Sequence, residues 1–591
     1  MSLTMAPGRQ KAFHFTASNC IGCHSCEAAC SEKNGLPAHI AWRKVGFIET
    51  GAFPDYRRIN VSMACNHCDD PVCLKGCPTR AYVKYADSGA VVQDSDVCFG
   101  CQYCTWVCPY GAPAFNPDTG TVSKCNFCVD RQAEGREPAC VEACLGHALA
   151  FGERDGLLAV HGAADRTLPG FPDPAITGPN VRFRFDGGHA PRYGRGDGDP
   201  LAYVDHGHGH RPDPGPVVTR IDWSRLRWSA LRSGETPLMV FTLIAQGVVG
   251  AFAVLYALSL GPHAGAVQGA AGGLLGVMAA LLGYGLFTST MHLGRPRYFY
   301  RAMNNLRHSW VSREILFVGG FMPLLVTYAL ARGLGLLGGP WLTALGGAAS
   351  LSGMVGIYCM VRIYRIPARP YWHHFHTGTL FAKSGLALGP LFLGAGVGGW
   401  SLVAGAAPDT VTVLHWCAGI ALWAVMSGVG ANFDLEADLE RQGGEGRAAI
   451  IRLKGDHGAA WLSRVVLALA ASVVLCGALA AGAVGMTTAL VSLALVLTLA
   501  GEVLERSLFY LVVVPTSMSG GYFLKNRRFE DLARETGLAR DPMVGVAPDP
   551  HHAGDGAHAP EQPEPEAAEP EVPGSARPPL APQHAWRAQA E

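Results

Sequence analysis

Long apolar windows dominate the second half of the chain. Runs of about twenty residues recur there, each long enough to cross a hydrocarbon core of about 30 Å as a helix. The predicted spans are 236–260, 272–291, 314–331, 341–361, 379–397, 411–430, 465–485 and 487–507. Buried helices of a soluble protein are neither so many nor so long. The pattern therefore predicts an all-α bundle of eight transmembrane helices, within residues 236–520.

Charged residues are rare inside these windows. Glu314, Lys383, Glu502 and Glu505 are placed toward the ends of the predicted spans and none is at a centre. Because ion-pumping proteins place charges deep in the membrane, this distribution argues against pumping. Abundant Gly and Ala suit close packing between membrane helices.

Two polar segments flank the bundle. Residues 156–235 are rich in Gly, Pro, Asp and His, too polar to order alone, and are expected to form a linker or lining segment. Within it, the alternating His206, His208 and His210 could bind a metal, but a solvated loop is the simpler interpretation. Residues 541–591 are rich in Pro, Ala and Glu and are expected to be a disordered tail.

Positive charges in the loops predict the orientation of the bundle. The approach to the first span and the second, fourth and sixth loops each carry at least three Lys or Arg, whereas the alternate loops carry at most one. Lys and Arg mark cytoplasmic loops. No export signal is evident before residue 20. We therefore expect an inner-membrane protein with the first 155 residues and both termini in the cytoplasm.

Cysteine is concentrated near the N-terminus. Of 19 cysteines in the 591-residue chain, sixteen lie between Cys20 and Cys144. They form four groups of four: Cys20, Cys23, Cys26, Cys30; Cys65, Cys68, Cys73, Cys77; Cys98, Cys101, Cys104, Cys108; and Cys125, Cys128, Cys140, Cys144. The formal net charge is zero, so no global field attracts nucleic acid.

The spacing of these groups indicates their chemistry. Two groups match C-x2-C-x2-C-x3-C, in which three thiolates hold one [4Fe-4S] cluster and the fourth ligates a neighbouring cluster. Disulfides would need an oxidising compartment. Zinc, the more serious alternative, has no use for a third closely spaced cysteine. Sixteen ligands at four per cluster predict four [4Fe-4S] clusters.

Residues 10–155 resemble the iron-sulfur electron-transfer subunit of the dimethyl sulfoxide reductase family of molybdoenzymes. The resemblance implies an α+β, bacterial-ferredoxin-like domain in which groups one and four, and groups two and three, exchange their last cysteines. The implied clusters are Cys20, Cys23, Cys26 with Cys144; Cys125, Cys128, Cys140 with Cys30; Cys65, Cys68, Cys73 with Cys108; and Cys98, Cys101, Cys104 with Cys77. The first would lie nearest the molybdenum partner and the last nearest the membrane.

The sequence departs from the family pattern in small ways. Ser31 and Leu145 stand where ferredoxin runs often have proline. Nitrate reductase relatives carry a tryptophan at the position of Cys101 and hold a [3Fe-4S] centre there. With cysteine at that position, all four clusters are expected to be cubanes.

The membrane half resembles the eight-helix, quinone-reactive anchor subunit of the same reductase. "STMHLGRPRYFYRAMNNLRHSWVSREILF" carries its His-Leu-Gly and Ser-x-Glu positions. The resemblance places the histidine and carboxylate of the quinone site at His292 and Glu314. Simple interface anchoring is the alternative for these two. Arg295, Trp310 and Arg313 either shape the pocket or merely flank it.

Together these features predict an electron-transfer and membrane-anchor subunit made by fusion of two family subunits. It would pass electrons between a separate molybdopterin catalytic subunit and membrane quinone. No haem is expected, because the spans offer only His415 besides His292. Sulfite oxidation with quinone reduction suits the cytoplasmic face; a quinol-oxidising reductase of dimethyl sulfoxide or an N-oxide, or a metal-stabilised scaffold without redox chemistry, are the alternatives.

Overall fold

A computed structural model shows the fold of the chain. It describes residues 10–37, 39–52, 54–161, 164–185, 190, 192–195, 202–205 and 210–516. The expected tail at 541–591 and the side chains of His206, His208 and His210 lie outside the described part. The predicted fold class is confirmed: a ferredoxin-like region of short strands and helices precedes a bundle of long apolar helices.

A three-stranded sheet joins the two ends of the cysteine-rich region. Its central strand, β1 (Lys11–Thr16), pairs antiparallel with β8 (Leu149–Glu153) and parallel with β9 (Val181–Arg184). Five of the six residues of β1 are buried, as a central strand requires. Phe13 and Phe15 pack into the domain core. The cysteine-rich segment is thus closed into one unit.

A second sheet lies at the edge of the same region. Its strand order is β12 (His210–Asp213), β11 (Ala202–Asp205), β10 (Arg192–Arg195), β2 (Lys44–Thr50) and β3 (Arg57–Met63). All neighbouring pairs are antiparallel.

Residues 156–235 therefore do more than connect two domains. This segment, expected to be a linker or lining segment, supplies β9 to the first sheet and β10, β11 and β12 to the second. Its composition still cannot order it alone, but the open edges of β1 and β2 offer unpaired backbone groups that extended segments can satisfy. Order here depends on pairing with distant strands.

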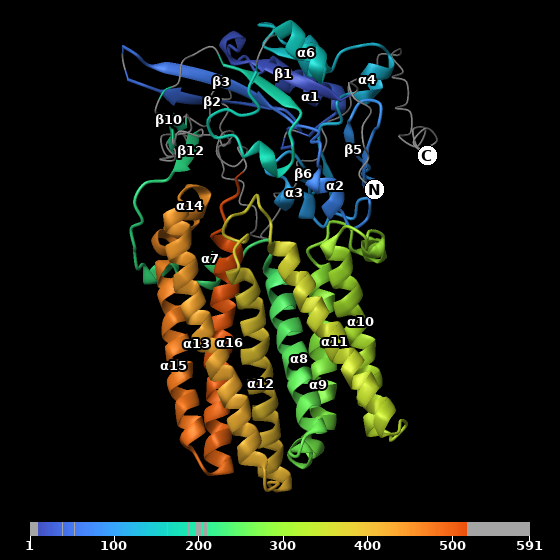
Figure 1. Cartoon of the computed structure of the whole chain (residues 1–591), viewed down its shortest axis with the longest axis vertical. Coiled ribbons are helices and arrows are strands. Elements are labelled where there is room, and N and C mark those ends of the chain that lie inside the picture. The colour runs from blue at the N-terminus through green and yellow to red at the C-terminus, as the bar shows by residue number, and fades with distance from the viewer. Residues whose placement is uncertain are drawn as a thin grey trace, which may run out of the picture. The chain divides into compact units, whose positions relative to one another are not determined.

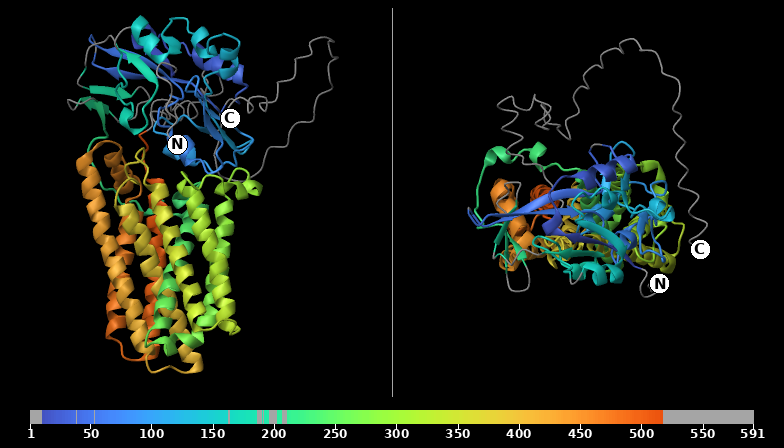
Figure 2. Two further views of the ribbon diagram at one scale, coloured as in Figure 1. Left: turned by 45° about the vertical axis from the view of Figure 1, so that its right-hand side comes forward. Right: turned by 90° about the horizontal axis from the view of Figure 1, so that it is seen from above.

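The eight predicted spans are confirmed as eight long apolar helices (Figure 1). They are α8 (Thr236–Leu260), α9 (Ala264–Thr290), α10 (Trp310–Gly333), α11 (Gly339–Tyr364), α12 (His376–Ala404), α13 (Thr410–Gln442), α15 (Gly458–Ala480) and α16 (Val484–Leu511). Most extend beyond the predicted windows. Their axes run side by side in two views (Figure 2).

Glycines allow two of these helices to approach closely. A Cβ atom on Gly250 of α8 would lie 2.0 Å from the carbonyl oxygen of Gly385 on α12. A Cβ on Gly389, one turn further along α12, would lie 2.4 Å from the backbone nitrogen of Ala251. Any larger residue would push the helices apart, as small-residue packing in membranes requires.

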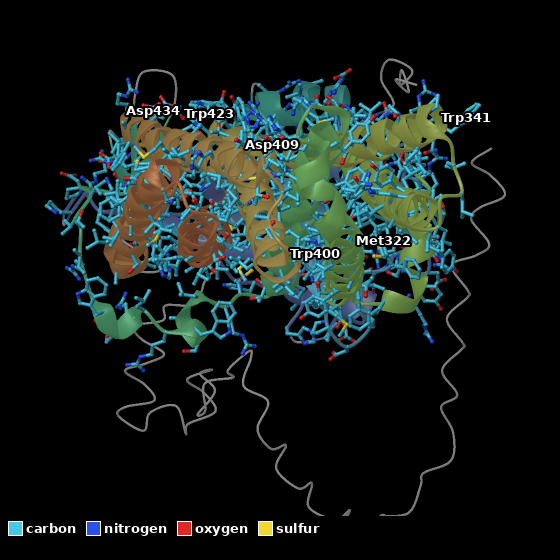
Figure 3. The ribbon with its side chains drawn as sticks, turned by 90° about the horizontal axis from the view of Figure 1, so that it is seen from below. Met322, Trp341, Trp400, Asp409, Trp423 and Asp434 are labelled. Carbon is cyan, nitrogen blue, oxygen red and sulfur yellow. The ribbon has the colours of Figure 1, made fainter. Side chains whose placement is uncertain are left out.

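Large side chains cover the outward faces of the bundle. Trp341, Trp400 and Trp423 are exposed. Figure 3, which shows the bundle end-on, places Trp341 at its rim. Exposed tryptophans on apolar helices are typical of surfaces that face lipid and its headgroups.

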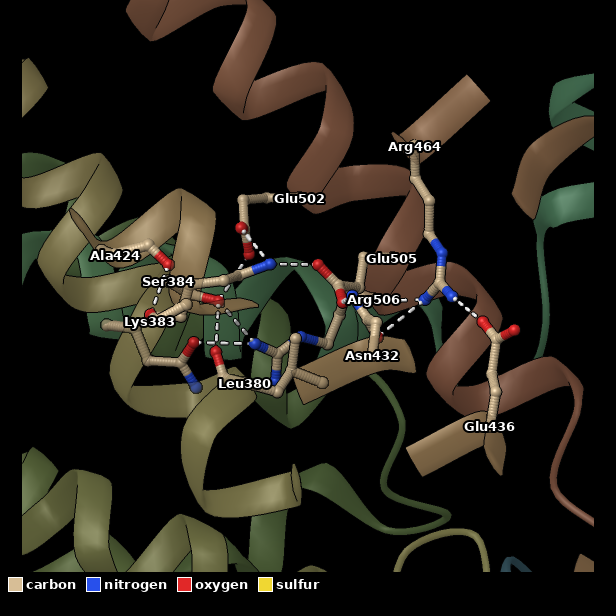
Figure 4. Close-up of polar contacts among 12 residues, drawn as sticks. Leu380, Lys383, Ser384, Ala424, Asn432, Glu436, Arg464, Glu502, Glu505 and Arg506 are labelled. Atoms are coloured by element: carbon tan, nitrogen blue, oxygen red, sulfur yellow. Dashed lines mark hydrogen bonds and ion pairs between the residues drawn. The ribbon is translucent and has the colours of Figure 1, made fainter. Parts of the chain in front are cut away.

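Charged side chains of several helices gather in one polar network between those helices (Figure 4). Lys383 of α12 forms ion pairs with Glu502, at 2.7 Å, and with Glu505, both on α16. Ser384 donates a hydrogen bond of 2.6 Å to Glu502. All four residues are buried. Their positions along the sequence alone did not reveal that they form one network.

The network continues into α13 and α15. Asn432 donates to Glu505 at 2.6 Å, and Arg464 bonds both Asn432, at 3.1 Å, and Glu436, at 2.9 Å. These side chains line a cavity of about 500 Å³. The unpartnered Nε of Arg464 and the hydroxyl of Thr498 belong to the same lining.

Replacing Lys383 tests how far this network stabilises the bundle. Lys383→Met leaves Glu502 and Glu505 buried beside one cation fewer, so we expect a loss of about 3–5 kcal/mol and a clearly lower thermal transition in detergent. Arg441→Met, which removes an exposed cation, is the control and should change the transition little. Equal transitions for both variants would contradict a stabilising role.

Candidate functional site

The cysteine runs begin in tight loops that lead into short helices. Gly22 and Gly100 each precede a cysteine and have φ angles of +69° and +76°, which glycine adopts without strain. The third cysteine of a run then lies in α1 (Ser25–Asn34), α2 (Val72–Gly76) or α3 (Tyr103–Val107). These turns fold successive thiols toward a common centre.

Two sets of four cysteines surround cavities. One cavity, of about 340 Å³, is lined by Cys20, Cys23, Cys26 and Cys144. Another, of about 360 Å³, is lined by Cys65, Cys68, Cys73 and Cys108. Each set combines three cysteines of one group with the last cysteine of a different group.

The remaining eight cysteines also gather across groups. Burial, and then the charges of Cys140 and Cys128, raise the pKa of Cys30 to about 12. Burial, and then the charges of neighbouring thiols that include Cys30 and Cys140, also raise the pKa of Cys125. Cys125 therefore lies near both thiols. The final set consists of Cys98, Cys101 and Cys104 together with Cys77.

These sets fit the chemistry of iron-sulfur clusters. Burial raises the pKa of thiols such as Cys108, to about 11, so the thiolate forms only where a positive metal centre offsets the cost. Among the described residues, no three His, Cys, Asp or Glu side chains converge closely enough to hold a single metal ion. The wider sets suit a centre with several irons, whose ligands stand further apart.

The set of Cys98, Cys101, Cys104 and Cys77, called the fourth set below, is bound through its peptides to a loop of the anchor. The backbone N–H of Gly294 donates to the carbonyl of Gly100 at 3.2 Å, and that of Arg295 donates to Phe99 at 3.0 Å. The side chain of Arg295 adds a hydrogen bond of 2.9 Å to the carbonyl of Thr119. The loop that carries Cys98 and Cys101 is thereby fixed against the segment after α9.

A second anchor segment binds the peptide around Cys77. Asn305 donates to the carbonyl of Cys77, and Ser309 to the carbonyl of Gly76, both at 2.8 Å. Ser309 is also the N-cap of α10. The start of α10 is therefore held beside a cysteine of the same set.

The two predicted quinone-site residues lie close in sequence to residues at this interface. His292 lies two residues before Gly294, and Glu314 two residues after Ser312, which is buried against the same interface. Both side chains are partly buried. No hydrogen bond or ion pair joins them in the described part of the chain. Each lies on a different anchor segment, and both segments bind peptides of the fourth set.

His292 has the properties of a ligand-binding histidine. Burial lowers its pKa to about 4, although a hydrogen bond to the Ser289 backbone opposes the shift. Its Nδ1 atom is buried and has no hydrogen-bond partner among the described residues. The imidazole is therefore neutral at pH 7 and has an unused polar atom.

Sequence reasoning missed a further pair beside the fourth set. Arg369 donates to the carbonyl of Trp106 at 3.2 Å, and burial lowers its pKa to about 10. Burial raises the pKa of Glu235 to about 7, although the charge of Arg369 opposes this. Trp106 lies two residues after Cys104. No local pattern marked these residues, because only the fold brings them together.

The flanking residues named from the sequence take different positions. Arg295 binds the cysteine domain through the contacts with Phe99 and Thr119. Arg313 stacks on Trp310 with 4.2 Å from its guanidinium carbon to the ring centroid, and Arg362 approaches the same ring at 4.9 Å. Trp310 and Arg313 thus stabilise the start of α10.

Comparisons with known proteins match both halves of the sequence. Residues 57–154 match the model of a 4Fe-4S dicluster domain, and residues 232–512 match that of the DMSO reductase anchor subunit (DmsC). A component of the anaerobic dimethyl sulfoxide reductase of Escherichia coli is 38% identical over 203 residues, which cover 33% of this chain and 96% of the relative. The protein belongs to the family of dimethyl sulfoxide reductase subunits.

Other relatives share the cysteine-rich half. A component of the sulfite dehydrogenase of Allochromatium vinosum is 36% identical over 155 residues, 23% of this chain and 65% of the relative. Protein NrfC of Escherichia coli is 42% identical over 140 residues, 23% of this chain and 63% of the relative. This family member joins an iron-sulfur electron-transfer subunit and a DmsC-type membrane anchor in one polypeptide.

The backbone contact at Gly294 is open to a direct test. A Cβ atom there would lie 2.1 Å from the carbonyl oxygen of Gly120, so Gly294→Ala must move the loop, at a cost of about 1–3 kcal/mol. We expect the amides of Gly294 and Arg295 to exchange hydrogen at least about tenfold faster. Gly265→Ala, where a Cβ meets open space, is the control. Unchanged exchange in Gly294→Ala would show that the contact is not tight.

Proposed function

We propose that the sixteen cysteines hold four [4Fe-4S] clusters in the cross-paired sets described above. Two sets line cavities and the other two gather by mutual proximity of their thiols, which supports this assignment. When bound, the clusters supply one-electron transfer. Electrons would pass along the sets in the order Cys20, Cys125, Cys65 and Cys98, toward the membrane.

The anchor would exchange electrons with quinone at the fourth set. This proposal is carried by one observation: the loop that contains His292 binds the peptide next to Cys101, and the segment that leads into α10, the helix of Glu314, binds the peptide of Cys77. Oxidation of a quinol releases two protons with its electrons, so a side chain that accepts protons must lie at its oxygens. The neutral imidazole of His292 suits one oxygen and the carboxylate of Glu314 the other.

Haem is not part of the proposed path. Bis-histidine ligation needs two histidines that face each other in the bundle. His376 is the first residue of α12 and lies at the end of the bundle that contacts the cysteine domain. His415 lies near the opposite end, where it bonds the carbonyl of Ala481 at 3.0 Å. These two histidines are too far apart along the bundle to share one iron.

The clusters would face the cytoplasm. The anchor segments that bind the cysteine domain carry Arg295, Arg301, Arg313 and Arg369, and positive charge marks the cytoplasmic side of membrane proteins. We infer that a separate molybdopterin subunit docks on the cysteine domain in the same compartment.

The partner's substrate decides the direction of electron flow. A cytoplasmic catalytic site suits sulfite oxidation with quinone reduction; reduction of dimethyl sulfoxide or an N-oxide by quinol is the alternative. The purified complex should reduce a quinone when given sulfite. Turnover with dimethyl sulfoxide and a quinol, and none with sulfite, would reverse the assignment.

Glu314→Gln tests the quinone site. The amide cannot take a proton, so quinone-linked turnover should fall about a hundredfold or more, the lower end of the range for loss of acid-base catalysis. Turnover with a soluble dye that receives electrons directly from the complex should be unaffected. Glu445→Gln is the matched control, because in the described part of the chain α14 (Gly444–Ile451) packs against β12 and not against the segments that carry Gly294 and Asn305. Wild-type quinone kinetics in Glu314→Gln would remove this residue from the site.

A further inference from the structure

Three cations are buried in the described part of the cysteine domain: Arg43, Lys124 and Arg182. Arg182 donates to the carbonyl oxygens of Pro179 and Val181. Arg43 and Lys124 instead lie among the cysteine sets. Only 2% of Arg43 and 3% of Lys124 is exposed. Neither side chain forms an ion pair with a carboxylate in the part of the chain that the structure describes. Because a buried charge is costly unless an opposite charge compensates it, some other negative group must lie close to each.

Arg43 lies between two cysteine sets. Its Nη1 donates to the Ser62 hydroxyl at 3.1 Å, and that hydroxyl is 3.3 Å from the sulfur of Cys26. On its other side are Cys30 and Cys140. Burial raises the pKa of both thiols, and the charge of Arg43 opposes that rise. Cys26 belongs to the first set, and Cys30 and Cys140 to the second.

The guanidinium of Arg43 also has unused donors. Its Nε and Nη2 atoms are buried and have no hydrogen-bond partner among the described residues. A cation with two free N–H groups, placed among thiolate ligands, is suited to donate to the sulfurs of an iron-sulfur centre. Hydrogen bonds to cluster sulfurs are one of the factors that set reduction potential.

Lys124 lies in the next gap along the row of cysteine sets, between the Cys125 set and the Cys65 set. Its ammonium group donates to the carbonyl oxygens of Cys125, at 3.0 Å, and of Val91. It also lines the cavity of the Cys65 set. Burial raises the pKa of Cys73, and Lys124 opposes this rise. The ammonium group is therefore fixed between the set that contains Cys125 and the set that contains Cys73.

The third gap, toward the membrane, holds a neutral group instead. Tyr82 is buried close to Cys104 and Cys73. Its phenol, like that of any tyrosine, carries no charge at pH 7. Charge compensation therefore differs along the row of sets. Arg43 and Lys124 each lie between two sets, whereas among the described residues the third gap is filled by Tyr82, whose ring centroid is 5.9 Å from the Lys124 ammonium.

We propose that Arg43 and Lys124 are fixed counter-charges that raise the reduction potentials of the clusters on either side of them. The proposal rests on the cluster assignment above. Reduction adds one electron, drawn from the catalytic partner or from quinol, to a cluster whose four thiolates already make it negative. A permanent cation in a medium of low dielectric lowers the cost of that electron and leaves distant clusters unaffected.

Each cation should act on a different pair of clusters. Arg43→Gln should lower the midpoint potentials of the Cys20 and Cys125 sets, and Lys124→Gln those of the Cys125 and Cys65 sets. The Cys125 set is common to both pairs. The Cys98 set, whose gap holds Tyr82, should move in neither variant.

The experiment is a redox titration of the full-length protein, purified without oxygen and followed by electron paramagnetic resonance. Two of four titrating components should shift to lower potential in each Gln variant. Arg43→Lys and Lys124→Arg, which keep the charge, should shift the same components less. Arg136→Gln removes an exposed cation and should shift none. Iron content of each variant reports whether the clusters are intact.

The possible results separate this proposal from the assignment beneath it. Fewer than four titrating components in the wild type would overturn the assignment of four clusters. Four components that are unmoved in iron-replete Gln variants, or that all move equally, would overturn the role of the cations alone. If Arg43→Gln loses iron, the Lys124 variants test the role of the cations: two of the four components should shift in Lys124→Gln, and unmoved components would overturn that role.

Discussion

The backbone hydrogen bonds between Phe99–Gly100 and Gly294–Arg295 are the constraint on which the other features of this protein depend. Electron transfer falls steeply with distance, so a cluster-binding domain is useful to a membrane pocket only when the two are held in contact. Side chains would enforce separation here: Gly100, Gly120 and Gly294 meet with so little space that a Cβ atom on any of them would lie under 3 Å from backbone atoms of another. Fusion into one chain provides proximity, and these glycines convert it into contact.

Both halves of the molecule also bury charge in surroundings of low dielectric. In the anchor, Lys383, Glu502 and Glu505 compensate one another between helices. In the cysteine domain, Arg43 and Lys124 form no ion pair with a carboxylate among the described residues; thiols, backbone carbonyls, the Ser62 hydroxyl and the rings of Phe13 and Tyr82 surround them. The first arrangement is complete within the protein, whereas the second is complete only with a negatively charged centre in place. This contrast indicates which polar cluster is structural and which is arranged around a bound group.

Much of this could be predicted from the sequence, because the decisive signals are local. The spacing of the cysteines and the eight apolar windows each lie within about twenty residues, the length of one spanning helix. What escaped prediction depends on distant residues. The strand β9 pairs with β1 and β10 pairs with β2, and β11 and β12 extend that second sheet. Arg369 and Glu235 influence each other's pKa only because the fold brings them near. Lys383 looked like an end-of-span charge until α16 supplied its partners. Polar composition predicted a linker or lining segment at residues 156–235, and gave no sign of the strands that this segment adds to two sheets.

The most direct test of the account is whether electrons pass between the clusters and quinone within this single chain. The full-length protein, without any partner, would be reduced with dithionite under anaerobic conditions, freed of excess reductant and mixed with an oxidised membrane quinone. Visible absorbance, bleached by reduction, reports the clusters. The account predicts that the absorbance returns as the quinone is reduced. Iron-replete protein that stays bleached in the presence of quinone, yet recovers with a soluble oxidant, would contradict it.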